Sequence, residues 1–170
     1  EAAFFDLDKT VIARASMVAF GRSFRRAGFI NRRILLRAAW NGAVFHLFGA
    51  DEERMRRFRE SALRITRGWD REVVRSHVRD NLTDVIDPIV YDEALELLHR
   101  HRAEGRLVFL VSASPEEIVF PLAEHLGVDG AIASRALIDD EGRYTGEVDV
   151  YAYGPHKAAA IAEVAAERGL

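Results

Sequence analysis

The pattern of apolar and polar positions divides the chain into a short opening strand, a long helical stretch and a mixed remainder. The opening run AAFF, at residues 2–5, leads into the polar stretch DLDKT, which predicts a buried strand followed by a loop. Residues 14–84 repeat apolar positions at helical spacing, with breaks near Gly28, Gly49 and Gly68. This pattern predicts four helices, at residues 14–27, 31–48, 51–67 and 70–84, with Asp51 and Asp70 as N-caps of the last two.

Beyond Pro88 the pattern alternates between helix and strand. Residues 89–104 predict an amphipathic helix, RLVFLVS at 106–112 predicts a fully buried strand, and Ser114-Pro115 marks the start of a helix ending near Gly127. Short strands near 130–133 and 136–138, a return through 144–148 and a last helix from Lys157 to Arg168 complete the pattern. We therefore expect an α/β fold, with an open Rossmann-like parallel sheet and a helical cap inserted after the first strand.

Composition narrows the class of protein. The chain has 170 residues, of which 49% are hydrophobic and 30% charged, and this predicts one compact globular unit. It contains no cysteine, which excludes disulfides, thiolate zinc sites and a cysteine nucleophile. The absence of cysteine fits a reducing interior, and we expect a cytoplasmic protein.

Positive charge is concentrated in the predicted cap. Although the net charge is only -3, residues 14–79 hold sixteen arginines against six acidic residues. A solvated helical surface is the favoured interpretation; the alternative is attraction of nucleic acid, acidic lipid or a phosphorylated substrate. The apolar stretch 37–50 is too short and too interrupted to span a bilayer, and we favour a buried helix over peripheral membrane contact.

Asp6 and Asp8 are the first candidates for chemistry. They follow the opening strand, and in an open α/β sheet ligands bind beyond the carboxyl ends of the strands. Cleavage of a phosphate ester needs one carboxylate that attacks phosphorus and one acid that protonates the leaving oxygen. Mg²⁺ held between carboxylate and phosphate would offset the repulsion between the two anions. A merely solvated turn is the structural alternative.

Two further loops carry groups that suit a phosphate ligand. Ser112 and Ser114 lie where a strand ends and a helix begins, and they offer hydroxyl groups and free backbone N–H groups. Lys157, near the start of the last helix, could bring positive charge to the phosphoryl oxygens. Arg135 could contact an anionic substrate, and a role in hairpin packing is the alternative.

These residues resemble the conserved motifs of a known family. DLDKT is similar to motif I of the haloacid dehalogenase superfamily of phosphatases, VSAS to its motif II and GPHK to the lysine-bearing motif III. The helical insert between motifs I and II, and the stretch LGVDGAIASRALIDDEGRYTGEV, resemble the phosphoserine phosphatase branch. The resemblance covers nearly the whole chain and implies a core formed by residues 1–13 and 85–170 with a cap at 14–84.

The resemblance also implies roles for individual residues. Asp6 would be the nucleophile that forms an aspartyl-phosphate, and Asp8 the general acid and then the base for water. Lys157 would neutralise charge, and Asp6 with the Asp8 carbonyl would bind Mg²⁺. The residues expected to bind substrate are Thr10, Ser112, Ala113 and Arg135.

The implied function is a Mg²⁺-dependent phosphomonoester hydrolase that acts on a small phosphorylated metabolite. The alternatives are a phosphotransferase with an acceptor other than water and a basic helical binding module for nucleic acid or acidic membrane, of which nucleic acid is the less favoured partner.

Two departures from the family pattern affect these expectations. The acidic motif IV would follow motif III, and we expect it beyond Leu170, so that the core would lack its last part. Phosphoserine phosphatases also place a glutamate seven residues after the second aspartate of motif I, where this chain has Ala15. Phosphoserine is therefore not the favoured substrate.

Overall fold

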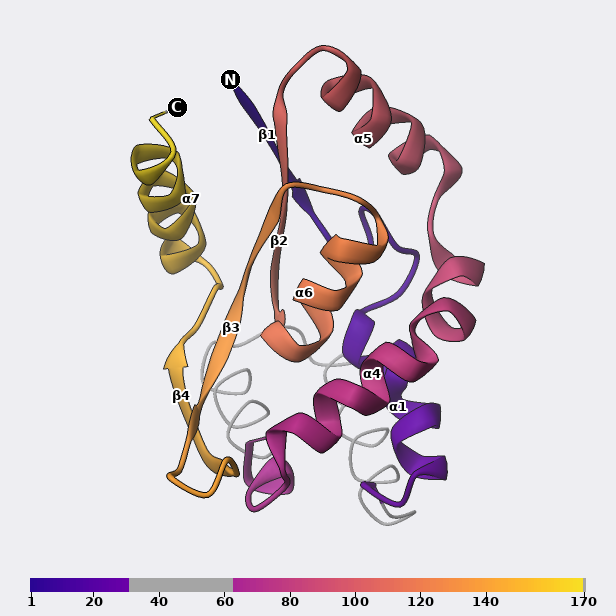
Figure 1. The fold of residues 1–170 in the computed structure, drawn as a ribbon, viewed down its shortest axis with the longest axis vertical. Coiled ribbons are helices and arrows are strands. Elements are labelled where there is room, and N and C mark those ends of the chain that lie inside the picture. Colours follow the sequence, from indigo (N-terminus) through magenta and orange to yellow (C-terminus); the bar gives the residue numbers. More distant parts are fainter. Residues whose placement is uncertain (31–62, 170) are drawn as a thin grey trace, which may run out of the picture.

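The computed structural model describes residues 1–30 and 63–169 (Figure 1). Asp51 and the apolar stretch 37–50 lie outside these residues, as do the predicted helix 31–48 and most of the helix 51–67.

A four-stranded sheet forms the centre of the described chain, in the order β1-β2-β3-β4. The parallel strands are β1 (Ala2–Asp6), β2 (Leu107–Pro115) and β3 (Gly130–Ile138), while β4 (Tyr144–Val150) pairs antiparallel with β3. The register places Asp6 beside Val111, so the motif I and motif II strands end at the same edge of the sheet. The α/β fold with a mostly parallel sheet is thus confirmed.

Helices cover both faces of the sheet (Figure 1). On β2, Val108 and Leu110 join the main core with Leu98 of α5 (Asp92–Ala103) and Leu122 of α6 (Glu116–His125). Val111 points to the opposite face, where it belongs to a smaller cluster covered by α7 (Pro155–Glu167). Because successive side chains of a strand point to opposite faces, a central parallel strand needs the continuous apolar run seen in the sequence.

The insert between β1 and β2 is helical where the structure describes it. Helix α1 (Ser16–Arg26) packs against α4 (Arg71–Ile86), which in turn packs against α6. Helix α4 presents one stripe of buried side chains at a spacing of four residues: Val74, Val78, Leu82 and Ile86. Its N-cap is Asp70, as predicted, whose side chain accepts a hydrogen bond from Val73 N at 3.1 Å. The division of the chain into core and cap remains a prediction.

Several boundaries differ from the sequence predictions. Strand β2 continues to Pro115, and α6 has Pro115 rather than Ser114 as its N-cap, because the Ser114 hydroxyl is engaged elsewhere. Residues 130–138 form one strand instead of two short ones, since pairing with both β2 and β4 keeps them extended. Helix α5 begins at Asp92, after the 3-10 turn η1 (Asp87–Ile89) and the bridge between Val90 and Ile12.

Candidate functional site

A tight loop after β1 presents the two aspartates. The Leu7 carbonyl accepts hydrogen bonds from the backbone N–H groups of Thr10, Val11 and Ile12, and the Leu7, Val11 and Ile12 side chains are fully buried. Within this loop Lys9 has a φ of 65°, a left-handed conformation that is costly for a residue with a side chain. The buried apolar residues therefore hold the loop in a shape that leaves Asp6 and Asp8 at the carboxyl edge of the sheet.

Asp6 lies at the open side of this site. Its side chain is 46% exposed, and Oδ1 forms an ion pair with Lys157 Nζ from the first turn of α7. Thr10 Oγ1 donates a hydrogen bond to Asp6 Oδ2 at 3.2 Å. The structure thus brings together three of the predicted site residues, from two segments about 150 positions apart.

Asp8 has a more enclosed environment. Its Oδ2 accepts hydrogen bonds from Ser112 Oγ at 2.9 Å and Ser114 Oγ at 3.0 Å, and its Oδ1 accepts one from Ser16 N at 2.7 Å. Ser112 and Ser114 are buried at the end of β2, and Ser16 is the buried first residue of α1. The two carboxyl groups therefore differ: Asp6 faces solvent beside a cation, while Asp8 is fixed by three donors.

This arrangement has groups suited to a divalent cation and a phosphate. Within the described residues no three histidine or acidic side chains cluster as a complete metal site. The oxygen donors present fit Mg²⁺ nonetheless, because Mg²⁺ commonly uses one or two carboxylates together with water and substrate phosphate. The Asp6 carboxylate and the Asp8 main-chain carbonyl are the groups that could hold it.

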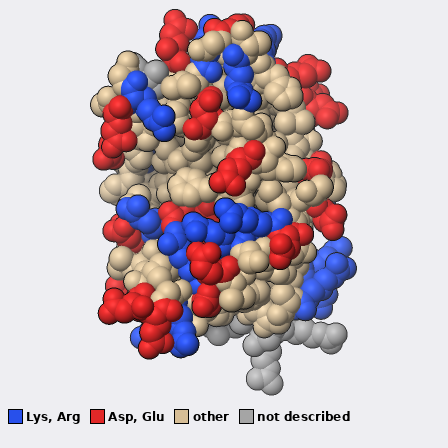
Figure 2. All heavy atoms as spheres, viewed as in Figure 1, with Lys and Arg blue, Asp and Glu red and all other residues tan. Residues whose placement is uncertain are grey.

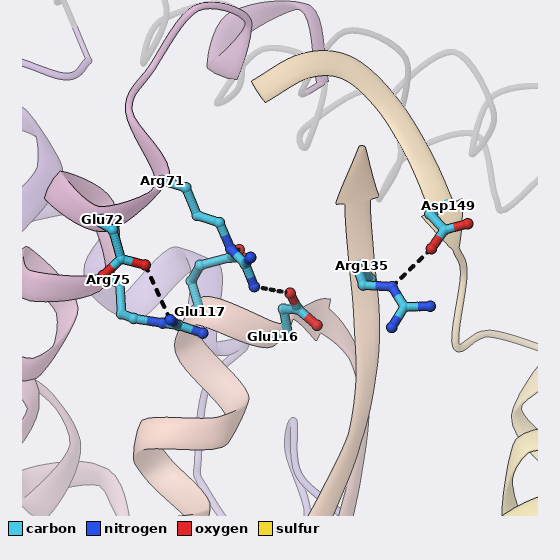
Figure 3. Close-up of polar contacts among 7 residues, drawn as sticks. All are labelled: Arg71, Glu72, Arg75, Glu116, Glu117, Arg135 and Asp149. Atoms are coloured by element: carbon cyan, nitrogen blue, oxygen red, sulfur yellow. Dashed lines mark hydrogen bonds and ion pairs between the residues drawn. The ribbon is translucent and has the colours of Figure 1, made fainter. Parts of the chain in front are cut away.

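The other two predicted substrate residues are not among the described residues that bond to the Asp6 or Asp8 side chain. Arg135 is on β3, and its Nε donates to Asp149 Oδ2 of β4 at 2.8 Å. Figure 3 shows its side chain turned toward Asp149, so the described contact supports the hairpin role. Ala113 lies within β2, between Ser112 and Ser114, with a half-buried side chain.

A pocket of about 280 Å³ opens beside the loop, between β1 and α5. Thr10 is the only predicted site residue in its lining, which also includes Phe5, Tyr91 and Leu97. None of the described residues that line this hollow carries a positive charge for a phosphate group, so the ion-paired Asp6 region is the better candidate for chemistry.

A buried charge cluster lies where β2 passes into α6 (Figure 3). Arg71, the first residue of α4, forms an ion pair with Glu116 and donates from Nε to Glu117 Oε1 at 3.0 Å. The Glu117 side chain is only 1% exposed, and its Oε2 lacks a hydrogen-bond partner in the part of the chain that the structure describes. Burial and the nearby Glu117 carboxylate raise the pKa of Tyr144. Arg71 therefore compensates buried negative charge while joining the insert to the motif II segment.

Replacing Arg71 with alanine should destabilise the fold. Removing one partner of a buried ion pair costs about 3–5 kcal/mol, and we expect about 3 kcal/mol here because the Arg71 side chain is 29% exposed. The matched control is Arg75→Ala: Arg75 is 28% exposed but pairs with Glu72, which is 73% exposed. That change should cost under about 0.5 kcal/mol. If urea denaturation showed equal losses of unfolding free energy in the two variants, it would contradict the role of Arg71 in compensating buried charge.

Glu116 should make stability depend on pH. Burial, followed by the Glu117 charge, raises the pKa of Glu116 above its ordinary value of 4.5, against the opposing effect of Arg71 and other arginines. At a pH between 4.5 and the raised pKa, Glu116 keeps its proton in the folded chain and has lost it in the unfolded chain. The stabilising contribution is therefore complete below pH 4.5 and declines as pH rises through the raised pKa. Glu116→Gln should remove this decline from a plot of unfolding free energy against pH; an unchanged slope would contradict it.

On the face of the described residues seen in Figure 2, basic and acidic side chains are intermixed. Figure 2 shows Lys and Arg in a band across the middle of one face, with Asp and Glu on both sides of it. Along α4, Arg71, Arg75 and Arg79 each pair with a carboxylate. The binding-module alternative thus has no specific support from the described residues. None of the helices described in residues 1–30 and 63–169 is long and apolar enough to cross a bilayer.

Two features of the site were not predicted from sequence. Ser16 shows no motif of its own, and the Ser114-Pro115 pair resembles a helix start, so neither residue signals a contact with Asp8. Glu116 and Glu117 likewise match the acidic first turn of a helix, and their contact with Arg71 spans more than forty positions.

Comparison with known proteins finds a matching family model and similar sequences. The family model described as haloacid dehalogenase-like hydrolase matches residues 3–170. A Streptomyces azureus protein named for inhibition of morphological differentiation is 49% identical over 168 residues, 99% of this chain and 61% of its own. A probable phosphatase of Mycobacterium tuberculosis is 47% identical, over 99% of this chain and 58% of its own. This chain therefore spans about three fifths of the length of these relatives.

Solved structures share the fold at low sequence identity. A protein of unknown function from Bordetella pertussis is 24% identical, with a TM-score of 0.83 over 99% of this chain and 75% of its own. A phosphoserine phosphatase in its apo form is 20% identical, with a TM-score of 0.61 over 98% of this chain and 70% of its own. At these identities the two structures show that the fold is shared.

Proposed function

The chain belongs to the haloacid dehalogenase-like hydrolases, and on that premise we propose that it is a Mg²⁺-dependent phosphomonoester hydrolase. The observation that carries the proposal is the pairing of Asp6 with Lys157, next to an Asp8 held by serine hydroxyls. The name of the M. tuberculosis relative as a probable phosphatase supports the same reaction class.

The chemistry begins at Asp6. Its half-exposed carboxylate attacks phosphorus while the bond from phosphorus to the ester oxygen breaks, and Asp8 donates a proton to that leaving oxygen. The product is an aspartyl-phosphate on Asp6. Asp8 then takes a proton from water, the water oxygen attacks phosphorus, and the bond to Asp6 breaks to release inorganic phosphate.

Other residues support this sequence of steps. The Lys157 ammonium, now paired with Asp6, provides positive charge for the phosphoryl oxygens. The Thr10 and Ser112 hydroxyls donate to Asp6 Oδ2 and Asp8 Oδ2 in the free protein, and each would have to turn from its carboxylate to donate to a phosphoryl oxygen. Mg²⁺ held by the Asp6 carboxylate and the Asp8 carbonyl would offset the charge of the phosphate as it meets the nucleophile. A cytoplasmic location remains a prediction.

The substrate proposed is a small phosphorylated metabolite other than phosphoserine. Ala15, the N-cap of α1, has no side chain that could hold an amine, and it stands where the phosphoserine phosphatase pattern has glutamate. Arg135 remains a candidate substrate contact only if it leaves Asp149.

The test is phosphate release by the full-length protein from a panel of alkyl and aryl phosphate monoesters. We expect release with Mg²⁺, loss of release with a chelator, and recovery when excess Mg²⁺ is restored. Release that is unaffected by the chelator would contradict the metal requirement. No release from any monoester would contradict the proposed function.

A further inference from the structure

The strongest feature that the proposed function leaves unexplained is a buried pair of serines behind Asp8. Ser16 Oγ donates to Ser114 Oγ at 2.8 Å, and Ser114 Oγ donates to Asp8 Oδ2 at 3.0 Å. Ser16 is 0% exposed and Ser114 is 6% exposed, so solvent does not replace these contacts. The two serines are 98 positions apart and come from different elements, the start of α1 and the end of β2.

We propose that Ser16 and Ser114 are positioning residues for Asp8, which hold its carboxyl group in the orientation needed for proton transfer and link it to α1. The inference rests on the proposed function, because it assigns a purpose to the orientation of Asp8.

The hydrogen bonds fix the carboxyl group from several directions. A serine hydroxyl can donate one hydrogen bond. Ser114 donates to Asp8 and accepts a hydrogen bond from Ser16. Ser112 uses its proton toward the same Oδ2 and accepts from Ser114 N at 3.0 Å. Since Ser16 N holds Oδ1 at 2.7 Å, rotation of the carboxyl group would break at least one buried hydrogen bond.

Proton transfer is sensitive to such an orientation. The acid must lie within hydrogen-bond reach of the leaving oxygen, and a misplacement of about 1 Å can cost about 100-fold in rate. The buried residues of the loop hold its backbone, but the Asp8 side chain can still rotate about its own bonds. Donors on β2 and α1, which are regular elements, provide the missing rigidity.

The contact between Asp8 and Ser16 also stabilises the start of α1. Ala15 caps α1 without a side-chain hydrogen bond, and the Asp8 carboxylate takes that role by accepting from Ser16 N in the first turn. The position of α1 and the orientation of Asp8 are therefore set by the same contacts.

The test compares two classes of ester in the full-length protein with Mg²⁺. An alkyl phosphate has a poor leaving group that needs a proton, whereas an aryl phosphate with an acidic phenol needs little help. In Ser114→Ala and Ser16→Ala we expect kcat/KM to fall about 10- to 100-fold for the alkyl ester and less than about threefold for the aryl ester. Ser114→Cys keeps the shape with a weaker donor and should show the same split.

Matched controls are available in two other buried serines. Ser134, in the middle of β3, accepts a hydrogen bond from Ala152 N at 3.1 Å, and Ser23 lies on α1 with its hydroxyl against His77 at 2.8 Å. Ser134→Ala and Ser23→Ala should leave the ratio of alkyl to aryl kcat/KM unchanged. A shift in that ratio as large as in Ser114→Ala would overturn the inference, as would equal losses on both esters in Ser114→Ala or no loss at all.

A stability measurement separates this inference from the proposed function. Ser114→Ala should raise the unfolding equilibrium constant about three- to tenfold in the wild type and less than about twofold in an Asp8→Ala background. Equal effects in both backgrounds would overturn the contact, and with it the inference, even in an active phosphatase. If the wild type releases no phosphate, the proposed function has failed. The catalytic purpose of the contact then fails with it, even if Ser114→Ala affects stability less in the Asp8→Ala background.

Discussion

Asp6→Asn should reduce phosphate release by at least about 10⁴-fold, to the limit of detection. Asparagine keeps the size of the side chain and can still accept a hydrogen bond from Thr10, but its amide cannot attack phosphorus to form an acyl phosphate. The fold should survive, because the lost ion pair joins a 46% exposed Asp6 and a 28% exposed Lys157, and such pairs contribute under about 1 kcal/mol.

The measurement is steady-state phosphate release together with thermal unfolding. Asp87→Asn is the matched control: Asp87 is 50% exposed and pairs with His125 at 2.6 Å, away from the site. It should lose a comparable small amount of stability and keep its activity. Turnover by Asp6→Asn within tenfold of the wild type would exclude Asp6 as the nucleophile.

Asp8→Asn should have the second-largest effect, and this effect should depend on the leaving group. General acid catalysis typically contributes about 10²–10⁴-fold, so kcat/KM for an alkyl phosphate should fall in that range. For an aryl phosphate with a good leaving group, kcat/KM should fall much less. Because Asp8 also activates water in the second step, the variant should release a burst of phenol and then turn over slowly.

Rapid mixing with an aryl phosphate measures both parts of this prediction. The variant should show a burst close to one equivalent per enzyme, whereas Asp6→Asn under the same conditions should show none. Equal losses for alkyl and aryl esters, without a burst, would mean that Asp8 acts only by holding the loop or the metal.

The fold was largely predictable because its signals are local. The apolar run 106–112 and the aspartates after residues 2–5 mark two strands whose carboxyl ends meet, and the structure places Asp6 and Val111 side by side. The proximity of Asp6 and Lys157 could be expected for the same reason, because the order of the motifs and the helix starts indicate which loops lie at the same edge of the sheet. The stripe of buried residues on α4 and its Asp70 cap are equally local.

The features of the site that could not be predicted from the sequence depend on contacts between distant segments. Ser114 resembles a helix cap, and only the arrival of Asp8 and Ser16 in the folded chain shows that its hydroxyl is used by them. Arg71 is one of many arginines in the insert, and no pattern distinguishes it from Arg75 until Glu117 is buried beside it. Buried polar partners are selected by three-dimensional packing, which one-dimensional periodicity does not contain.

Chemical trapping of the phosphoenzyme tests the central claim most directly. The full-length protein is mixed with substrate and Mg²⁺, quenched in acid and reduced with borohydride, which converts an aspartyl-phosphate to homoserine. Mass spectrometry of the peptide that contains residues 1–14 then identifies the modified position. We expect homoserine at position 6, dependent on substrate and enriched in the Asp8→Asn variant. Unmodified Asp6 in an enzyme that is turning over, or homoserine at another position, would contradict it.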